Sequence, residues 1–253
     1  MRTRLASAAL ALAAVAFPTR LFAAEGSPEA LALATKEVAA TGGASWEKAR
    51  YFRFDFLVDF PERKAGPFAH YWDRWTGVYR VDVSGDDGYS AYFNVNDPKN
   101  AGKAVILRKG ARVTGEDAAK VLAKAYGRFI NDSYWLLAPL KVLDPGVKLE
   151  DGGTATFDGK GARVLKLSFS GVGLTPGDAY RHYLDPATGA LLGWEYMLET
   201  KQEGKWKWVD VADFAGLKLS MRKVTEDGTR TIKFENVSVS ATVDAAALEP
   251  PAP

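Results

Sequence analysis

Residues 51–60 read YFRFDFLVDF, and this stretch decides the fold. Phenylalanine or valine stands at every second position from residue 52 to residue 60, whereas Arg53, Asp55 and Asp59 stand between them. Side chains along a β-strand point alternately to opposite faces. The spacing therefore predicts a strand with one apolar face and one polar face, and we expect the polar face to be solvated.

Other parts of the chain have the same character. Ten further segments read as strands, separated by turn clusters such as Ser84-Gly85-Asp86-Asp87-Gly88. They lie near residues 69–75, 78–83, 89–95, 104–108, 163–169, 180–184, 191–198, 206–211, 217–224 and 229–239. Strands that follow one another so closely pair antiparallel. The sequence thus predicts a mainly β (α+β) fold with about eleven strands.

Two helices interrupt the strands. Ser27 and Pro28 begin a predicted helix over residues 28–40. Thr114 begins a second one, which leads into RFINDSYWLLAPLKVLDPGV at residues 128–147. That run is too apolar for an ordinary loop, and its two prolines argue against one long helix. We expect a helical insertion at about 115–143 that lies across the sheet as a lid.

The first 24 residues predict a cleaved signal peptide. Arg2 and Arg4 form a basic head, an apolar stretch of about a dozen residues follows, and Ala23 and Ala24 end the segment. Removing it takes three arginines and no acid, which leaves 30 of the 33 basic residues against 31 acidic ones. A nearly neutral mature chain argues against nucleic acid as a partner.

The sequence contains no cysteine. This excludes disulfides, cysteine-ligated metals and acylation of an N-terminal cysteine, so we do not expect a lipoprotein. No later hydrophobic run approaches the length of a membrane span. We expect an exported soluble protein, periplasmic if its source is a Gram-negative bacterium. Residues 25–248 should form a single domain, and the proline-rich end at 249–253 a disordered tail.

The two histidines stand in a partial repeat, HYWDRWTG at residues 70–77 and HYLDPATG at residues 182–189. A histidine three residues before an aspartate invites a metal site. However, residues three apart on a strand face opposite sides. The D-x-x-T-G part is better explained as a hairpin corner, in which the aspartate caps the turn and the glycine supplies a positive φ.

No catalytic residue, metal site or cofactor is predicted. The chain lacks a G-x-S-x-G elbow, a phosphate-binding loop and a dinucleotide fingerprint. A hydrolase that uses His70 or His182 is the least supported alternative.

Aromatic residues on alternating strand positions are the remaining signal. They fill the core of a covered sheet, or they line a pocket for an acyl chain in a curved sheet that is only partly filled. The second alternative makes the apolar insertion a lid. The candidate lining and lid residues are Phe52, Phe54, Phe56, Trp72, Tyr134, Trp135, Leu136, Leu140, Trp194 and Tyr196.

The order of elements resembles a known superfamily, the LolA-type periplasmic carriers of outer-membrane lipoproteins and their LolB-type receptors. YFRFDF after the first helix, YLDPATGAL at 183–191, GLKLS at 216–220 and IKFENVSV near the end carry the resemblance. It implies a half-open antiparallel barrel whose concave face is closed by helices. It also implies a lipid or acylated protein as ligand.

Two functions therefore stand beside each other. The first is a carrier that holds a hydrophobic or acylated ligand between the sheet and the lid, is expected to be a monomer, and meets a protein partner in the outer or inner membrane. The second is a periplasmic interaction module without a lipid ligand, whose partner docks at a sheet edge or loop.

Overall fold

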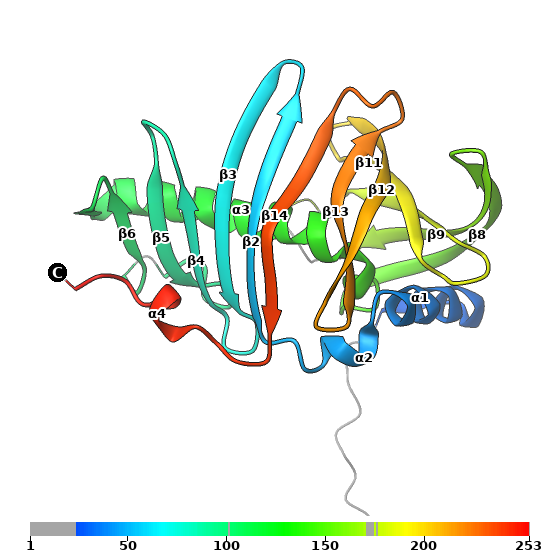
Figure 1. Cartoon of the computed structure of the whole chain (residues 1–253), viewed down its shortest axis with the longest axis horizontal. Coiled ribbons are helices and arrows are strands. Elements are labelled where there is room, and N and C mark those ends of the chain that lie inside the picture. Colours follow the sequence, from blue (N-terminus) through cyan, green and yellow to red (C-terminus); the bar gives the residue numbers. More distant parts are fainter. Residues whose placement is uncertain (1–23, 101, 171–174, 176, 253) are drawn as a thin grey trace, which may run out of the picture.

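The computed structural model describes residues 24–100, 102–170, 175 and 177–252. All of the expected signal peptide except Ala24 lies outside these residues. Within them, one large sheet is accompanied by four helices (Figure 1).

The first half of the chain makes both edges of the sheet and part of its centre. It contains β1 (Glu25–Gly26), α1 (Pro28–Ala40), α2 (Gly43–Trp46), β2 (Tyr51–Phe60), β3 (Arg63–Asp73), β4 (Val78–Val83), β5 (Tyr89–Asn94), β6 (Val105–Arg108) and β7 (Ala111–Val113). The predicted helix at 28–40 is confirmed. It begins where the hydroxyl oxygen of Ser27 accepts a hydrogen bond of 3.2 Å from the Ala30 amide.

A long helix separates the two halves. The second half consists of α3 (Gly115–Lys141), β8 (Val147–Phe157), β9 (Lys160–Phe169), β10 (Ala179–Leu184), β11 (Leu191–Met197), β12 (Glu203–Phe214), β13 (Leu217–Thr225), β14 (Thr231–Ser240) and α4 (Ala245–Leu248). Residues 249–252 follow α4 in neither helix nor strand.

The sheet consists of two runs of chain neighbours, β2 to β7 and β8 to β14. The runs join where β14 pairs antiparallel with β2, and β1 pairs parallel with β8 at one edge. The mainly β class and the single curved sheet are confirmed. The sheet has fourteen strands instead of the expected eleven, because β1, β7 and β8 were not predicted.

The segment at 128–147 differs from the expectation. Residues 128–141 continue α3 without a break, and Pro139 lies inside the helix. A proline removes one helical hydrogen bond and costs roughly 3 kcal/mol in a helix interior. The cost is offset because Leu136, Leu137 and Leu140 become buried around it.

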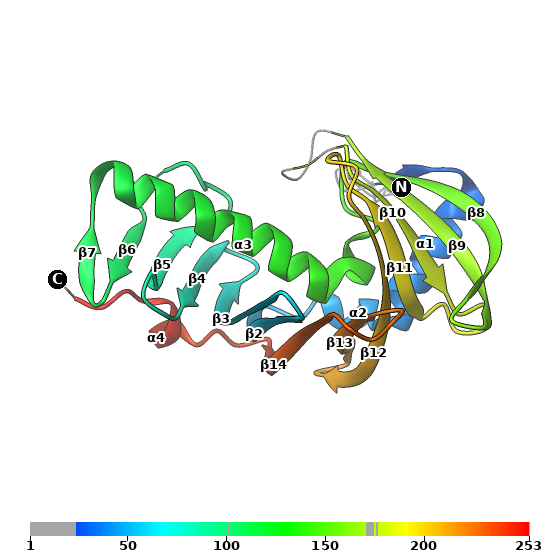
Figure 2. The ribbon, with the colours of Figure 1, turned by 90° about the horizontal axis from the view of Figure 1, so that it is seen from above.

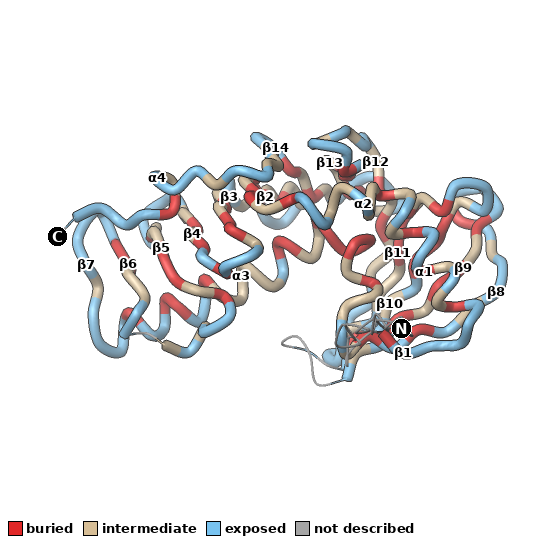
Figure 3. The backbone as a smooth tube through the Cα atoms, turned by 90° about the horizontal axis from the view of Figure 1, so that it is seen from below, coloured by how far each residue is buried: buried red, intermediate tan, exposed pale blue. Residues whose placement is uncertain are grey.

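Helix α3 covers one face of the sheet, here called the inner face. Figure 2 shows α3 running along β2–β7. Figure 3 shows the buried residues concentrated where the helices meet the strands. The inner face includes Phe52, Phe54 and Phe56, which alternate along β2 as predicted.

The opposite face of β2 is less solvated than expected. Asp55 is buried and lies 2.9 Å from the Arg53 guanidinium. Its other oxygen accepts a hydrogen bond of 2.7 Å from the side-chain amide of Asn236. Asn236 lies where the register of β14 shifts and has a positive φ of 50°. Asp55 thus stabilises the irregular pairing that joins the two runs.

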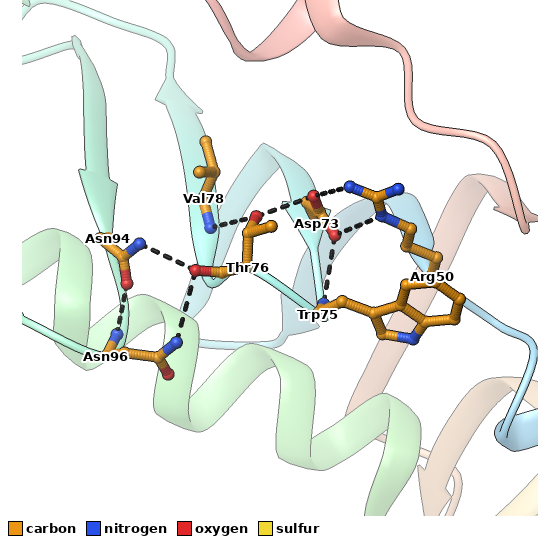
Figure 4. A network of polar contacts seen from close by, with 7 residues as sticks. All are labelled: Arg50, Asp73, Trp75, Thr76, Val78, Asn94 and Asn96. Carbon is orange, nitrogen blue, oxygen red and sulfur yellow. Dashed lines mark hydrogen bonds and ion pairs between the residues drawn. The ribbon is translucent and has the colours of Figure 1, made fainter.

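Both copies of the repeat form the predicted turns. After β3, the Asp73 carboxylate accepts hydrogen bonds from the Trp75 amide and the Thr76 hydroxyl, at 3.1 and 2.7 Å (Figure 4). Gly77 has a φ of 78°. After β10, Asp185 accepts hydrogen bonds from the amides of residues 187 and 188, and residue 189 has a φ of 81°.

Asp73, in the first of these turns, makes the stability of the fold depend on pH in the acid range. Asp73 also accepts two hydrogen bonds from Arg50, at 3.0 and 2.8 Å, and these lower its pKa from 3.8 to about 2. Because the pKa of Asp73 is lower in the folded chain than in the unfolded chain, its charged carboxylate stabilises the fold above pH 3.8. This contribution is lost as the pH falls towards 2. Asp73→Asn should lower stability by about 1–3 kcal/mol at neutral pH.

Urea unfolding at a series of pH values checks this expectation. The difference between the wild type and Asp73→Asn should shrink between pH 4 and pH 2. A difference that stays constant over this range would show that the Asp73 charge does not stabilise the turn.

Candidate functional site

The predicted lining residues of the first half lie on the inner face. Phe52, Phe54, Phe56 and Trp72 are all buried there, and Trp72 contacts Phe129 of α3 with ring centroids 5.1 Å apart. In this conformation the helix, and no open space, lies against them. These residues form the floor beneath α3.

The C-terminal half of α3 meets β10–β12 in what we call the aromatic cluster. It consists of Tyr134, Trp135, Tyr180, Trp194, Tyr196 and Trp206. Trp194 is at its centre, with ring centroids 4.7 Å from Trp135 and 5.1 Å from Tyr180. Trp135 also lies 5.1 Å from Trp206.

The aromatic cluster extends from the core to the surface. Trp194 and Trp206 are buried, whereas Tyr134, Trp135, Tyr180 and Tyr196 are partly exposed. Large aromatic side chains bind apolar ligands well when part of their surface is accessible. The cluster is therefore an accessible part of the inner face.

All ten predicted site residues lie in a single hydrophobic core. Leu136 and Leu140 of α3 are buried in it, with exposed fractions of 0% and 3%. The structure thus brings the predicted lining and lid together. Three of the ten, Tyr134, Trp135 and Tyr196, are partly exposed, and the other seven are buried.

A buried polar contact fastens α3 to the sheet. His70 on β3 stacks on Phe54 and forms a hydrogen bond with the Tyr79 hydroxyl. Its Nε2 lies 3.2 Å from Asp132 Oδ2 on α3, which is within the distance of an ion pair. The two groups are not aligned as a hydrogen bond requires. Arg128 lies 3.4 Å from the same oxygen. Apart from Arg128, these groups are fully buried.

A second buried contact fastens α1. Nδ1 of His182 on β10 lies 2.8 Å from Glu37 Oε1, and neither side chain has exposed surface. Burial raises the pKa of Glu37, although the charge and hydrogen bond of His182 act in the opposite direction. The histidines of the repeat therefore have the same role, since each joins the sheet to an acidic residue of a helix. Neither is accessible to a substrate in solution.

Lys223, which no pattern in the sequence distinguishes, is fully buried on the inner face of β13. Its Nζ lies 4.3 Å from the Trp208 ring and 4.4 Å from the Phe234 ring. It donates a hydrogen bond of 2.5 Å to the Ser220 carbonyl. Burial sets the pKa of this amine well below its ordinary value.

The fold of this chain is similar to that of a solved structure. The crystal structure of a DUF1329 family protein from Desulfovibrio piger superposes with a TM-score of 0.50 at 11% identity, over 87% of this chain and 97% of that chain. The two chains share a fold.

Two further solved structures resemble this chain. One is a LolA superfamily protein from Nitrosomonas europaea, with a TM-score of 0.45 and 9% identity over 83% of this chain and 98% of that chain. The other is a putative outer membrane lipoprotein-sorting protein domain from Vibrio parahaemolyticus, with a TM-score of 0.44 and 8% identity over 87% and 96%.

No family model and no curated protein matches the sequence.

A groove of about 1000 Å³ crosses one end of β8–β12. Its apolar lining includes Leu149, Leu167, Tyr180 and Tyr196. By the alternation of the strands, its charged side chains point away from Trp194. They are Lys148, Glu150, Lys166, Arg181, Glu195, Glu203 and Lys205. Several of them pair with one another, as do Lys166 and Glu150 at 2.6 Å.

Metal and membrane sites are not found in the described part of the chain. Its histidine and carboxylate side chains form no group of three or more that could hold a metal ion. None of its helices combines the length and apolar character that crossing a membrane requires.

Proposed function

We propose that this protein binds a hydrophobic or acylated ligand, such as a lipid or the acyl chains of a lipoprotein, between the inner face and α3. The aromatic cluster carries the proposal, because six aromatic side chains meet there and four of them reach the surface. The ligand enters there, beside Trp135 and Tyr196, and α3 acts as the lid.

Displacing α3 has a cost, which the ligand must offset. Burial of an acyl chain contributes about 0.8 kcal/mol per methylene, so roughly ten methylenes contribute about 8 kcal/mol. A ligand shifts the lid only as far as it binds the open form more tightly than the closed form. The partly exposed aromatic rings lower this cost, because they offer a first contact while α3 stays in place.

The same proposal includes the location of the protein. An exported, unanchored chain would act in the periplasm, receive its ligand from one membrane and deliver it to a protein partner at the other. The likeness in fold to the DUF1329 family protein supports the sheet-and-helix architecture and leaves the ligand to experiment.

The test of the binding proposal is native mass spectrometry of the mature protein purified from the exported fraction, followed by denaturing extraction. A co-purified lipid or acylated peptide is the expected result. An empty protein that also fails to bind added fatty acids would overturn the proposal.

Trp135→Ala gives a local test. The ring contacts Trp194 and Trp206 and is partly exposed, so its removal takes away part of the apolar surface offered to the ligand. Affinity for a fluorescent fatty acid should fall about tenfold, which corresponds to about 1.4 kcal/mol. Trp75→Ala is the matched control, because Trp75 is 56% exposed on the turn after β3. Equal affinities of the two variants would place the ligand elsewhere.

The charged groove on β8–β12 favours a second candidate function, a docking site for a protein partner. A pull-down that yields one stoichiometric protein, without lipid, and that is lost when Lys166 and Arg181 are changed to glutamate would favour this alternative.

A further inference from the structure

The inner face contains a lysine amine without an acidic partner. Lys223 has no exposed surface, and no acidic side chain in the described residues forms an ion pair with it. Its neighbours are two aromatic rings and one backbone carbonyl. A buried amine in such surroundings is costly, so a site that retains one needs an explanation.

A second unpaired donor lies beside it. The indole N–H of Trp208 is buried without a hydrogen-bond acceptor, and the ring of the same residue is the one that Lys223 contacts. The amine has one acceptor, the Ser220 carbonyl, for its three N–H groups, and the indole N–H has none, which makes this spot complementary to an anion. Trp208 also lies 5.2 Å from Trp194, which connects the spot with the aromatic cluster.

Trp135 of α3 contacts Trp194 and Trp206, and Trp194 contacts Trp208, the strand partner of Lys223, so this spot lies next to the proposed lid. A ligand that displaces α3 would bring an anionic group to the two donors while its chain lies along the aromatic cluster. An amphiphile with one charged end fits both features, whereas a neutral lipid leaves the donors unpaired.

We infer that Lys223, with the indole N–H of Trp208, binds the anionic head group of an amphiphilic ligand, a carboxylate or a phosphate. The inference rests on the proposed function and names the class of its ligand. Lys223 is a specificity residue in this scheme, and the apolar chain supplies most of the affinity.

The wild-type protein provides the first test, by calorimetry with four ligands of equal chain length: palmitate, hexadecyl phosphate, hexadecanol and hexadecylamine. Palmitate or hexadecyl phosphate should bind at least tenfold more tightly than hexadecanol, and hexadecylamine more weakly still. The stronger of the first two identifies the head group. Acetate and inorganic phosphate should not bind measurably, because they lack the chain.

Lys223→Met is the second test. The anionic ligand should lose at least tenfold in affinity, whereas hexadecanol should bind within about twofold of the wild type. Lys218→Met is the matched control, because Lys218 is exposed on the same strand. Thermal unfolding checks that both variants are folded.

The outcomes separate the two proposals. Equal binding of palmitate, hexadecyl phosphate and hexadecanol, or an anionic ligand unaffected by Lys223→Met, overturns the head-group inference and leaves the carrier function standing. Failure of all four ligands to bind overturns both.

Discussion

Replacing Asp132 by alanine should lower the free energy of unfolding by about 3–5 kcal/mol. Its carboxylate is fully buried and lies 3.2 Å from His70 and 3.4 Å from Arg128. It also accepts a hydrogen bond of 2.7 Å from the Asn131 side chain. Removing one member of a buried polar set leaves its partners unsatisfied, which costs more than the set itself contributes.

Urea unfolding followed by circular dichroism at neutral pH measures this loss. Asp117→Ala is the control, because Asp117 is exposed in the first turn of the same helix. Its loss should stay below about 1 kcal/mol, the usual size of an interaction with the helix dipole. If Asp132→Ala costs no more than the control, α3 is held by apolar packing alone, and its release requires no change at His70.

Trp194→Ala should also be strongly destabilising, by about 3–5 kcal/mol. The side chain is 1% exposed and contacts Tyr134, Trp135, Tyr180, Tyr196 and Trp208, besides His182. Deleting it leaves a cavity between α3 and β11 that cannot close without moving the helix.

Trp194→Phe is the matched variant, since it keeps an aromatic ring in the same place. We expect it to cost less than half as much as alanine. A similar cost for both variants would mean that the shape of the indole, and not the buried area, stabilises the cluster. A small cost for both would contradict the central position assigned to Trp194.

The strands with clear alternation could be predicted from the sequence, and β2 is the best example. Its phenylalanines face α3, as their period of two requires. Strand β8 was missed because Gly152 and Gly153 break the pattern at a register shift between Asp151 and Thr154. The pair Asp158-Gly159, both with positive φ, makes the following hairpin turn. Such a pair is a strong hairpin signal and would have revealed the strand.

The continuity of α3 could not be read from local preferences. Pro139 argues for an interruption, and only the tertiary burial of the neighbouring leucines overrides it. For the same reason, the pattern of aromatic residues does not reveal whether they line a pocket or fill a core. Their exposure depends on where α3 lies across the sheet.

The polar residues of the inner face were the hardest to predict. His70 and His182 stand in a visible repeat, but Asp132 and Glu37, their partners, come from helices far away in sequence. Lys223 occupies an inward position of β13 with no local sign of burial. Such contacts are set by the packing of helices on the sheet, which a single sequence does not specify.

β2 and β14 are neighbours in the sheet, but they are synthesised near opposite ends of the chain. Asp55 and Asn236, which meet in this pairing, are 181 residues apart. One edge of β2 pairs with β3, the next strand in the chain, whereas the other edge waits for nearly the whole chain before β14 reaches it. Contacts between such distant residues form slowly, because closing a long loop costs entropy. Until Ser240 has been delivered, this second edge of β2 leaves its backbone N–H and C=O groups open to pairing with other chains. The centre of the finished sheet is therefore the last part of it to form.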